Sequence, residues 1–132
     1  MAEKKSRETL TRRIVSILKL LNTKSDDMEA SALISRDGIC IAADLRQGVN
    51  SDRLAAMCAT LLGLADTAVK ELERGALQQV LLYGSEGILL LIQVGKDHVL
   101  ALEAKPSINV GMILLDARKT AKMLVSMVPR QR

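Results

Sequence analysis

Few side chains in this sequence have the type and spacing needed for metal or nucleophilic chemistry. His98 is the only histidine, and it begins a predicted strand without a cysteine or acidic run at ligand spacing. Cys40 and Cys58 lie inside apolar runs and form no Cys-x-x-Cys pair, which is typical of reduced core residues in a reducing compartment. The sequence therefore predicts no metal, no cofactor and no thiol nucleophile.

Two other patterns resemble chemical sites only superficially. Gly84-Ser85-Glu86-Gly87 looks like a phosphate loop, but it lies between two predicted strands, and no Gly-Lys-Ser/Thr follows it. Glu71 and Glu73 could form paired carboxylates, yet beside Lys70 and Arg74 they are typical of a solvated last helical turn. We therefore expect a protein that is not an enzyme.

The composition excludes functions that depend on aromatic rings. The chain has 132 residues, 48% of them hydrophobic and 26% charged, which suits one soluble globular domain. Tyr83 is the only aromatic residue, so no platform exists for stacking bases, sugars or flavins. Without a basic-aromatic groove or a known motif, we expect no nucleic-acid partner.

The positive charge is concentrated at the two ends of the chain. Residues 1–13 carry +3 and residues 117–132 carry +5, while the stretch between them carries −4. Solvated helix faces usually explain such charge, so contact with an anionic membrane surface is a lesser alternative. Residues 1–13 lack the apolar core of a secretory signal, and no run approaches the length of a membrane span. We expect a cytoplasmic protein.

Hydrophobic periodicity and turn residues predict the order αββαβββα. Apolar residues at steps of three and four mark helices, and short apolar runs bounded by turn residues mark strands. The short links between the last three strands require an antiparallel meander. The run from Ile88 to Ile92 has no polar alternation, so its strand should be covered on both faces. The expected elements are helices at 6–22, 51–74 and 109–127, and strands at 30–35, 39–44, 78–83, 88–94 and 98–104.

The fold class that follows is α/β, or more strictly α+β. Its predicted architecture is a five-stranded antiparallel sheet with helices on both faces. The domain should span residues 10–128, between a basic N-terminal extension at 1–9 and a basic tail at 129–132.

The central helix is apolar on more sides than one sheet can cover. Twelve residues from Leu54 to Ala65 pass without a charge. We expect one stripe to face the sheet, formed by Leu54, Met57, Leu61, Leu64 and Ala68. A second stripe would then face a partner helix: Ala55, Ala59, Leu62, Gly63 and Asp66. The alternative is a helix buried deeply within its own domain.

The predicted strand at 78–83 strengthens the case for a partner. It contains neither charge nor proline, so as an edge strand it would be free to pair with another chain. Two copies could then pair about a twofold axis while their central helices pack together. Gln78, Val80 and Leu82 join the five helix residues above as the predicted homodimer interface.

Three segments together resemble the roadblock family, which is related to dynein light chains. They are EASALISRDGICIAADL at 29–45, DRLAAMCATLLGLADTAVKELERG at 52–75 and QQVLLYGSEGILLLIQVG at 78–95. The resemblance covers about residues 10–127 and implies a roadblock/profilin-like fold. It also implies that the second helix covers one face of the sheet, that the first and third cover the other, and that dimers form through the second helices and third strands.

The resemblance further implies a scaffolding role. Family members, including the MglB-like type, serve as platforms for small Ras-like GTPases, or as subunits of motor and signalling scaffolds. We therefore expect a non-enzymatic dimeric module that binds and regulates a small Ras-like GTPase. A structural adaptor without a role in the nucleotide cycle is the alternative, and a second roadblock protein is an alternative partner. Arg36, Arg46, Arg53 and Arg74 are arginines that could touch a GTPase, although no motif marks any of them as a finger.

Overall fold

The computed structural model describes residues 2–128 and contains the eight elements in the predicted order. Each predicted element is present, with ends that differ by a few residues. The elements are α1 (Ala2–Asn22), β1 (Met28–Ser35), β2 (Cys40–Asp44), α2 (Ser51–Glu71), β3 (Gln79–Gly84), β4 (Gly87–Val94), β5 (His98–Ala104) and α3 (Val110–Val125).

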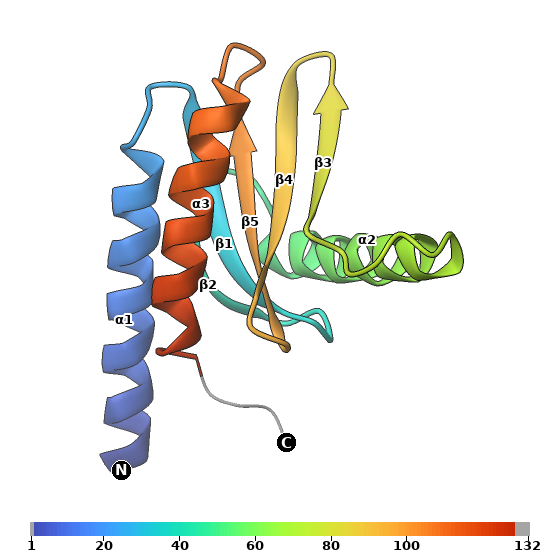
Figure 1. The fold of residues 1–132 in the computed structure, drawn as a ribbon. Coiled ribbons are helices and arrows are strands. Elements are labelled where there is room, and N and C mark those ends of the chain that lie inside the picture. Colours follow the sequence, from blue (N-terminus) through green and yellow to red (C-terminus); the bar gives the residue numbers. More distant parts are fainter. Residues whose placement is uncertain (1, 129–132) are drawn as a thin grey trace.

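The five strands form one antiparallel sheet in the order β2-β1-β5-β4-β3 (Figure 1). Short turns join β1 to β2, β3 to β4 and β4 to β5, so each of these pairs lies side by side. β5 returns to the centre of the sheet and pairs with β1. The two edges are therefore β2 and β3, which confirms that the uncharged strand near residue 80 is an edge strand.

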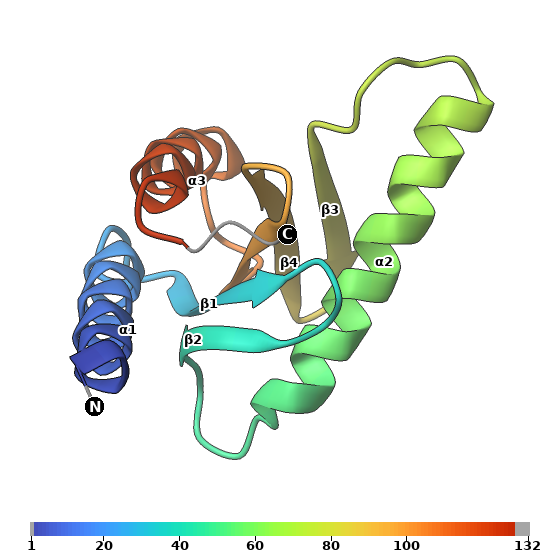
Figure 2. The ribbon, with the colours of Figure 1, turned by 90° about the horizontal axis from the view of Figure 1, so that it is seen from below.

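The helices form two layers on opposite faces of the sheet. Figure 2 shows α1 and α3 on one face and α2 alone on the other. Because side chains alternate along a strand, β4 buries Leu90 and Ile92 on the α1–α3 side and Leu91 on the α2 side. The prediction of a strand covered on both faces is confirmed, and so is the five-stranded sheet between two helical layers.

Local sequence explains where α2 and α3 begin. The side chains of Asn50 and Asn109 each accept a hydrogen bond from a backbone N–H three residues later, that of Arg53 and that of Met112. The turn between β1 and β2 passes close under α2 at Gly38, which has a φ of +93°. A Cβ at that position would be in ordinary contact with the Cα of Ala56, at 3.5 Å, so it is the positive φ that favours glycine there.

The two ends of the chain differ in what the structure describes. Residues 2–9, expected as a separate basic extension, continue α1 as its first two turns and are exposed. The predicted tail at 129–132 lies outside the described residues. None of the helices within residues 2–128 is both long and apolar enough to cross a bilayer.

Candidate interaction site

Only the first half of α2 packs into the domain. Its buried residues are Ala55, Cys58 and Leu62, which contact Ala32, Val99 and neighbouring strand residues. From Gly63 to Glu71 no residue of α2 is buried. Figures 1 and 2 both show this second half extending past the edge strand β3. About half of the helix is therefore available for contact with another molecule.

A line of apolar side chains runs along one side of α2, and we call it the α2 stripe. Met57, Leu64 and Leu72 are 55%, 69% and 68% exposed, which is unusual for residues so apolar. Leu54 and Leu61 lie at the margin of the core and are half-buried. The stripe consists of Leu54, Met57, Leu61, Leu64, Ala68 and Leu72.

The prediction of which side of α2 faces the sheet is wrong for four residues. Ala55 and Leu62, predicted to meet a partner, are 0% and 1% exposed and face the sheet. Met57 and Leu64, predicted to face the sheet, point to solvent instead. Both stripes of α2 are similarly apolar, so hydrophobic periodicity predicts both of them without indicating which one packs against the sheet. The stripe that faces the sheet is set by the rotation of α2 about its own axis, which depends on tertiary contacts.

The remaining predicted helix residues lie on the flank of α2 nearest the β1–β2 turn. Asp66 is already engaged within the protomer: its Oδ2 lies 3.0 Å from Nζ of Lys70 and 3.8 Å from Nη2 of Arg36. Ala59 lies 3.8 Å from where a Cβ on Gly38 would stand. Gly63 is exposed, with open space around it. Their role in an interface stays a prediction.

The outer edge of β3 is open along its whole length in the single chain. Val80 is half-buried on the α2 side, while Leu82 and Tyr83 are 40% and 68% exposed. Gln78, predicted as the first residue of this strand, is exposed and precedes it by one position. With neither charge nor proline, the edge has none of the features that usually prevent pairing with another strand.

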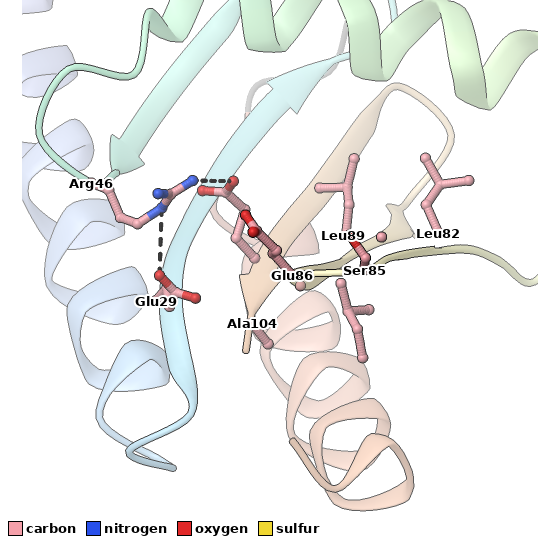
Figure 3. A pocket seen from close by; sticks show the side chains of 11 residues that line it. Glu29, Arg46, Leu82, Ser85, Glu86, Leu89 and Ala104 are labelled. Carbon is pink, nitrogen blue, oxygen red and sulfur yellow. Dashed lines mark hydrogen bonds and ion pairs between the residues drawn. The ribbon is translucent and has the colours of Figure 1, made fainter. Parts of the chain in front are cut away.

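A groove of about 540 Å³ lies on the α2 side of the sheet, beside the β3–β4 hairpin. Leu82 and Leu89 lie at one end of the groove, and Arg46 projects into it beside Glu29 at the other (Figure 3). The remaining lining comes from the hairpin residues 84–88 and from Glu103 and Ala104 of β5. The groove therefore combines apolar and charged surface next to the open edge.

Ion pairs organise the charged end of the groove. Nη2 of Arg46 donates to Oε1 of Glu103 at 3.0 Å, and its Nε lies 3.6 Å from Oε2 of Glu29. The hydrogen bond to Glu103 is the main cause that raises the pKa of Arg46. Oε2 of Glu103 is buried without a hydrogen-bond partner among the residues that the structure describes.

The two cysteines and the histidine, considered above for chemistry, are buried or half-buried within the domain. Burial raises the pKa of Cys58 to about 11, which leaves an unreactive thiol, and burial also raises the pKa of Cys40. His98 is 2% exposed, and desolvation lowers its pKa. Within residues 2–128 no three His, Cys, Asp or Glu side chains gather closely enough to hold a metal ion.

Comparison with known proteins agrees with this architecture. The model of the Roadblock/LC7 domain family matches residues 16–104, which is most of the chain. The chain belongs to the Roadblock/LC7 domain family. A relative in Methanocaldococcus jannaschii, the uncharacterized protein MJ1340, is 25% identical over 104 residues, which are 79% of this chain and 90% of that protein.

Solved structures show the same fold as this roadblock domain. MglB of Myxococcus xanthus aligns with a TM-score of 0.81 at 17% identity, covering 92% of this chain and 95% of MglB. A roadblock/LC7 domain from Streptomyces avermitilis gives 0.79 at 18% identity, covering 83% and 92%. The roadblock/profilin-like fold class predicted from the sequence is confirmed.

The α2 stripe, the β3 edge and the groove all lie on or beside the same face of the roadblock domain. The sequence predicts the apolar surplus of α2 and the uncharged edge strand, but not the exposed positions of Leu72 and Tyr83 or the groove. Leu72 carries a sequence signal, since it interrupts a polar run, whereas Tyr83 only continues the apolar run of its strand. The groove carries none, because Glu29, Arg46 and Glu103 come from three separate segments. The whole face is suited to binding protein.

Proposed function

We propose that this chain is a non-enzymatic, homodimeric roadblock module that binds a small Ras-like GTPase in the cytoplasm. The observation that carries the dimer is the half-covered α2 beside an open β3 edge. An apolar stripe and an unpaired strand on the same side of a domain both favour association with a second chain.

A twofold axis perpendicular to the sheet would satisfy both features at once. The β3 strands of two copies would pair antiparallel, and the two α2 helices would run antiparallel on the same face. The unburied half of α2, from Gly63 to Glu71, spans about 13 Å at 1.5 Å per residue. Strands lie about 4.8 Å apart, so this half would cover β3 and β4 of the second copy. The groove beside Leu82 and Leu89 lies there.

The energies indicate that helix packing and strand pairing are both needed. Burying Met57, Leu64 and Leu72 in each copy would contribute roughly 1 to 2 kcal/mol per side chain, since each is already partly covered. The total of roughly 6 to 12 kcal/mol is comparable with the cost of bringing two molecules together. Pairing of the β3 edges would supply the remaining stabilisation.

The GTPase part of the proposal rests on family membership and on the resemblance to the MglB type. The four arginines that could touch such a partner differ in whether they already form ion pairs. Arg36 and Arg46 already form ion pairs with acidic groups of their own chain. Arg53 in the first turn of α2 and Arg74 just after its end are exposed and form no ion pair within residues 2–128.

The first test is solution mass by light scattering across a dilution series. A mass near twice 14.3 kDa that persists on dilution supports the homodimer, and a stable monomer contradicts it.

The second test uses purified small Ras-like GTPases from the same genome, loaded with GDP or with a GTP analogue. Calorimetric binding that favours one nucleotide state supports the proposed function, and turnover assays then show whether hydrolysis changes. If no GTPase binds in either state while the dimer persists, the GTPase role is wrong. The structural adaptor then becomes the better hypothesis.

A further inference from the structure

The charges of this domain are segregated between its two helical layers. α1 carries six basic and two acidic residues, and α3 carries three basic and one acidic. Residues 23–109, which include the whole sheet and α2, carry eight basic and twelve acidic. The α1–α3 layer is therefore strongly positive, while the rest of the domain is negative.

The outward side of α3 mixes lysines with exposed apolar residues. Ile113, Ala117, Thr120, Ala121 and Leu124 are buried in the domain, so the opposite side of α3 points away from the sheet. Met112, Leu115 and Met123 are 58%, 54% and 52% exposed. Lys119 and Lys122 are exposed among them, and the half-buried Asp116 beside Met112 is the one acidic residue of α3.

α1 continues the same surface beside α3 (Figure 2). Arg12, Arg13 and Lys19 are exposed, and so is Leu20 on the side of the helix away from the core. These cations are not neutralised locally. Among the described residues, the one ion pair that involves α1 or α3 is Arg7–Glu3, near the start of α1.

We propose that this α1–α3 face binds the surface of a membrane that contains acidic phospholipids. Lysine and arginine side chains would meet the phosphate and carboxylate headgroups, while the adjacent leucine and methionine side chains would enter the headgroup boundary. Long basic side chains suit this role because their alkyl stems lie along apolar surface while their charges reach the headgroups. The contact is peripheral, since no described helix can span the bilayer.

The proposed dimer would strengthen such binding without being required for it. An axis perpendicular to the sheet keeps both α1–α3 layers on one side, so the dimer would present two basic faces to the same membrane. The α2 faces would then point away, toward the aqueous phase. Two weak contacts held together bind far more tightly than either alone.

Nucleic acid fits this face less well than a lipid surface does. Neither α1 nor α3 carries an aromatic side chain within the described residues, and the lone Tyr83 lies on β3. On a nucleic acid, the exposed leucine and methionine side chains between the cations would lie against charged phosphates. On a membrane they would enter an apolar phase.

The experiment is co-sedimentation of the full chain with vesicles of phosphatidylcholine alone and with vesicles that also contain phosphatidylserine. We expect binding only to the acidic vesicles, and we expect high salt to release the protein. Replacement of both Lys119→Glu and Lys122→Glu should weaken binding by about tenfold or more. The matched control, Arg53→Glu with Arg74→Glu, makes the same change of charge on the α2 layer and should bind the vesicles like the parent.

Three outcomes would overturn the inference. They are equal binding to both vesicle types, equal losses in the two double variants, and no vesicle binding by a protein that instead binds duplex DNA. Light scattering on the same protein preparations without vesicles tests the dimer proposal separately. A dimer that ignores acidic vesicles contradicts the membrane contact alone, whereas a monomer that binds them contradicts the dimer alone.

Discussion

Arg46 and Glu103 are 57 residues apart in the sequence, yet their side chains meet at 3.0 Å on the α2 side of the sheet. The contact ties the loop that precedes α2 to the central strand β5. Glu29 on β1 lies 3.6 Å from the same guanidinium, so one arginine faces carboxylates from two strands. This arrangement shapes the groove beside the proposed dimer contact.

Replacing this arginine should have a small effect on stability. Arg46 is 51% exposed, and solvent screens ion pairs of that kind. We expect Arg46→Met to lower the free energy of unfolding by about 1 kcal/mol or less. Urea unfolding at low and high salt measures the difference, which should shrink as salt rises. A loss several times larger, unaffected by salt, would show that the loop depends on Arg46 for more than charge.

A charge in the α2 stripe should separate the two copies. Leu64 is 69% exposed in the single chain, so Leu64→Glu should leave the monomer fold intact. In the dimer it would remove two buried leucines and bury two carboxylates, at a cost of about 3 kcal/mol or more. Light scattering should therefore report a monomer at concentrations where the parent is a dimer.

The matched control for that variant is Leu115→Glu on α3. Leu115 is 54% exposed on the opposite layer, so the same substitution there should leave the dimer mass unchanged. If both variants or neither becomes monomeric, the α2 stripe is not the contact.

A proline at the open edge should test strand pairing separately from helix packing. Gly84 and Gly87 close a two-residue hairpin, so hydrogen bonding to β4 alternates along β3 and the N–H of Tyr83 points outward. Tyr83→Pro removes that donor while keeping the bonds to β4. We expect a folded protein with a weaker dimer by sedimentation velocity, whereas Tyr83→Thr keeps the donor and should dimerise. Equal association of the two variants would argue against β3 pairing.

Burial of His98 should make the protein less stable in mild acid. Its pKa is lowered in the folded state, mainly by desolvation, while Asp97 and Asp37 act in the opposite direction. The unfolded chain takes up this proton near pH 6.5 and the folded protein only at lower pH, so protonation favours unfolding as the pH falls below that value. Between pH 7.5 and 5.5, the melting temperature of the parent should fall more than that of His98→Gln. Parallel curves would contradict this prediction.

Local patterns were sufficient to predict the order of elements and the fold class. Apolar periodicity placed the three helices, and the turn residues around Gly38 and Gly84 separated the strands. These signals are local because a helix or hairpin depends on residues only a few positions apart. The edge position of β3 also follows from such short links, once β5 is known to pair with β1.

The tertiary structure decided which surfaces remain free. The sequence by itself determined that α2 has more apolar residues than one sheet can bury, but Ala55 and Leu64 are equally compatible with either face. Only the crossing of α2 over the strands settles this, because the sheet ends beneath the middle of the helix. The groove and the charge-segregated layers likewise depend on contacts between segments far apart in the chain. Periodicity within one element carries no information about such contacts.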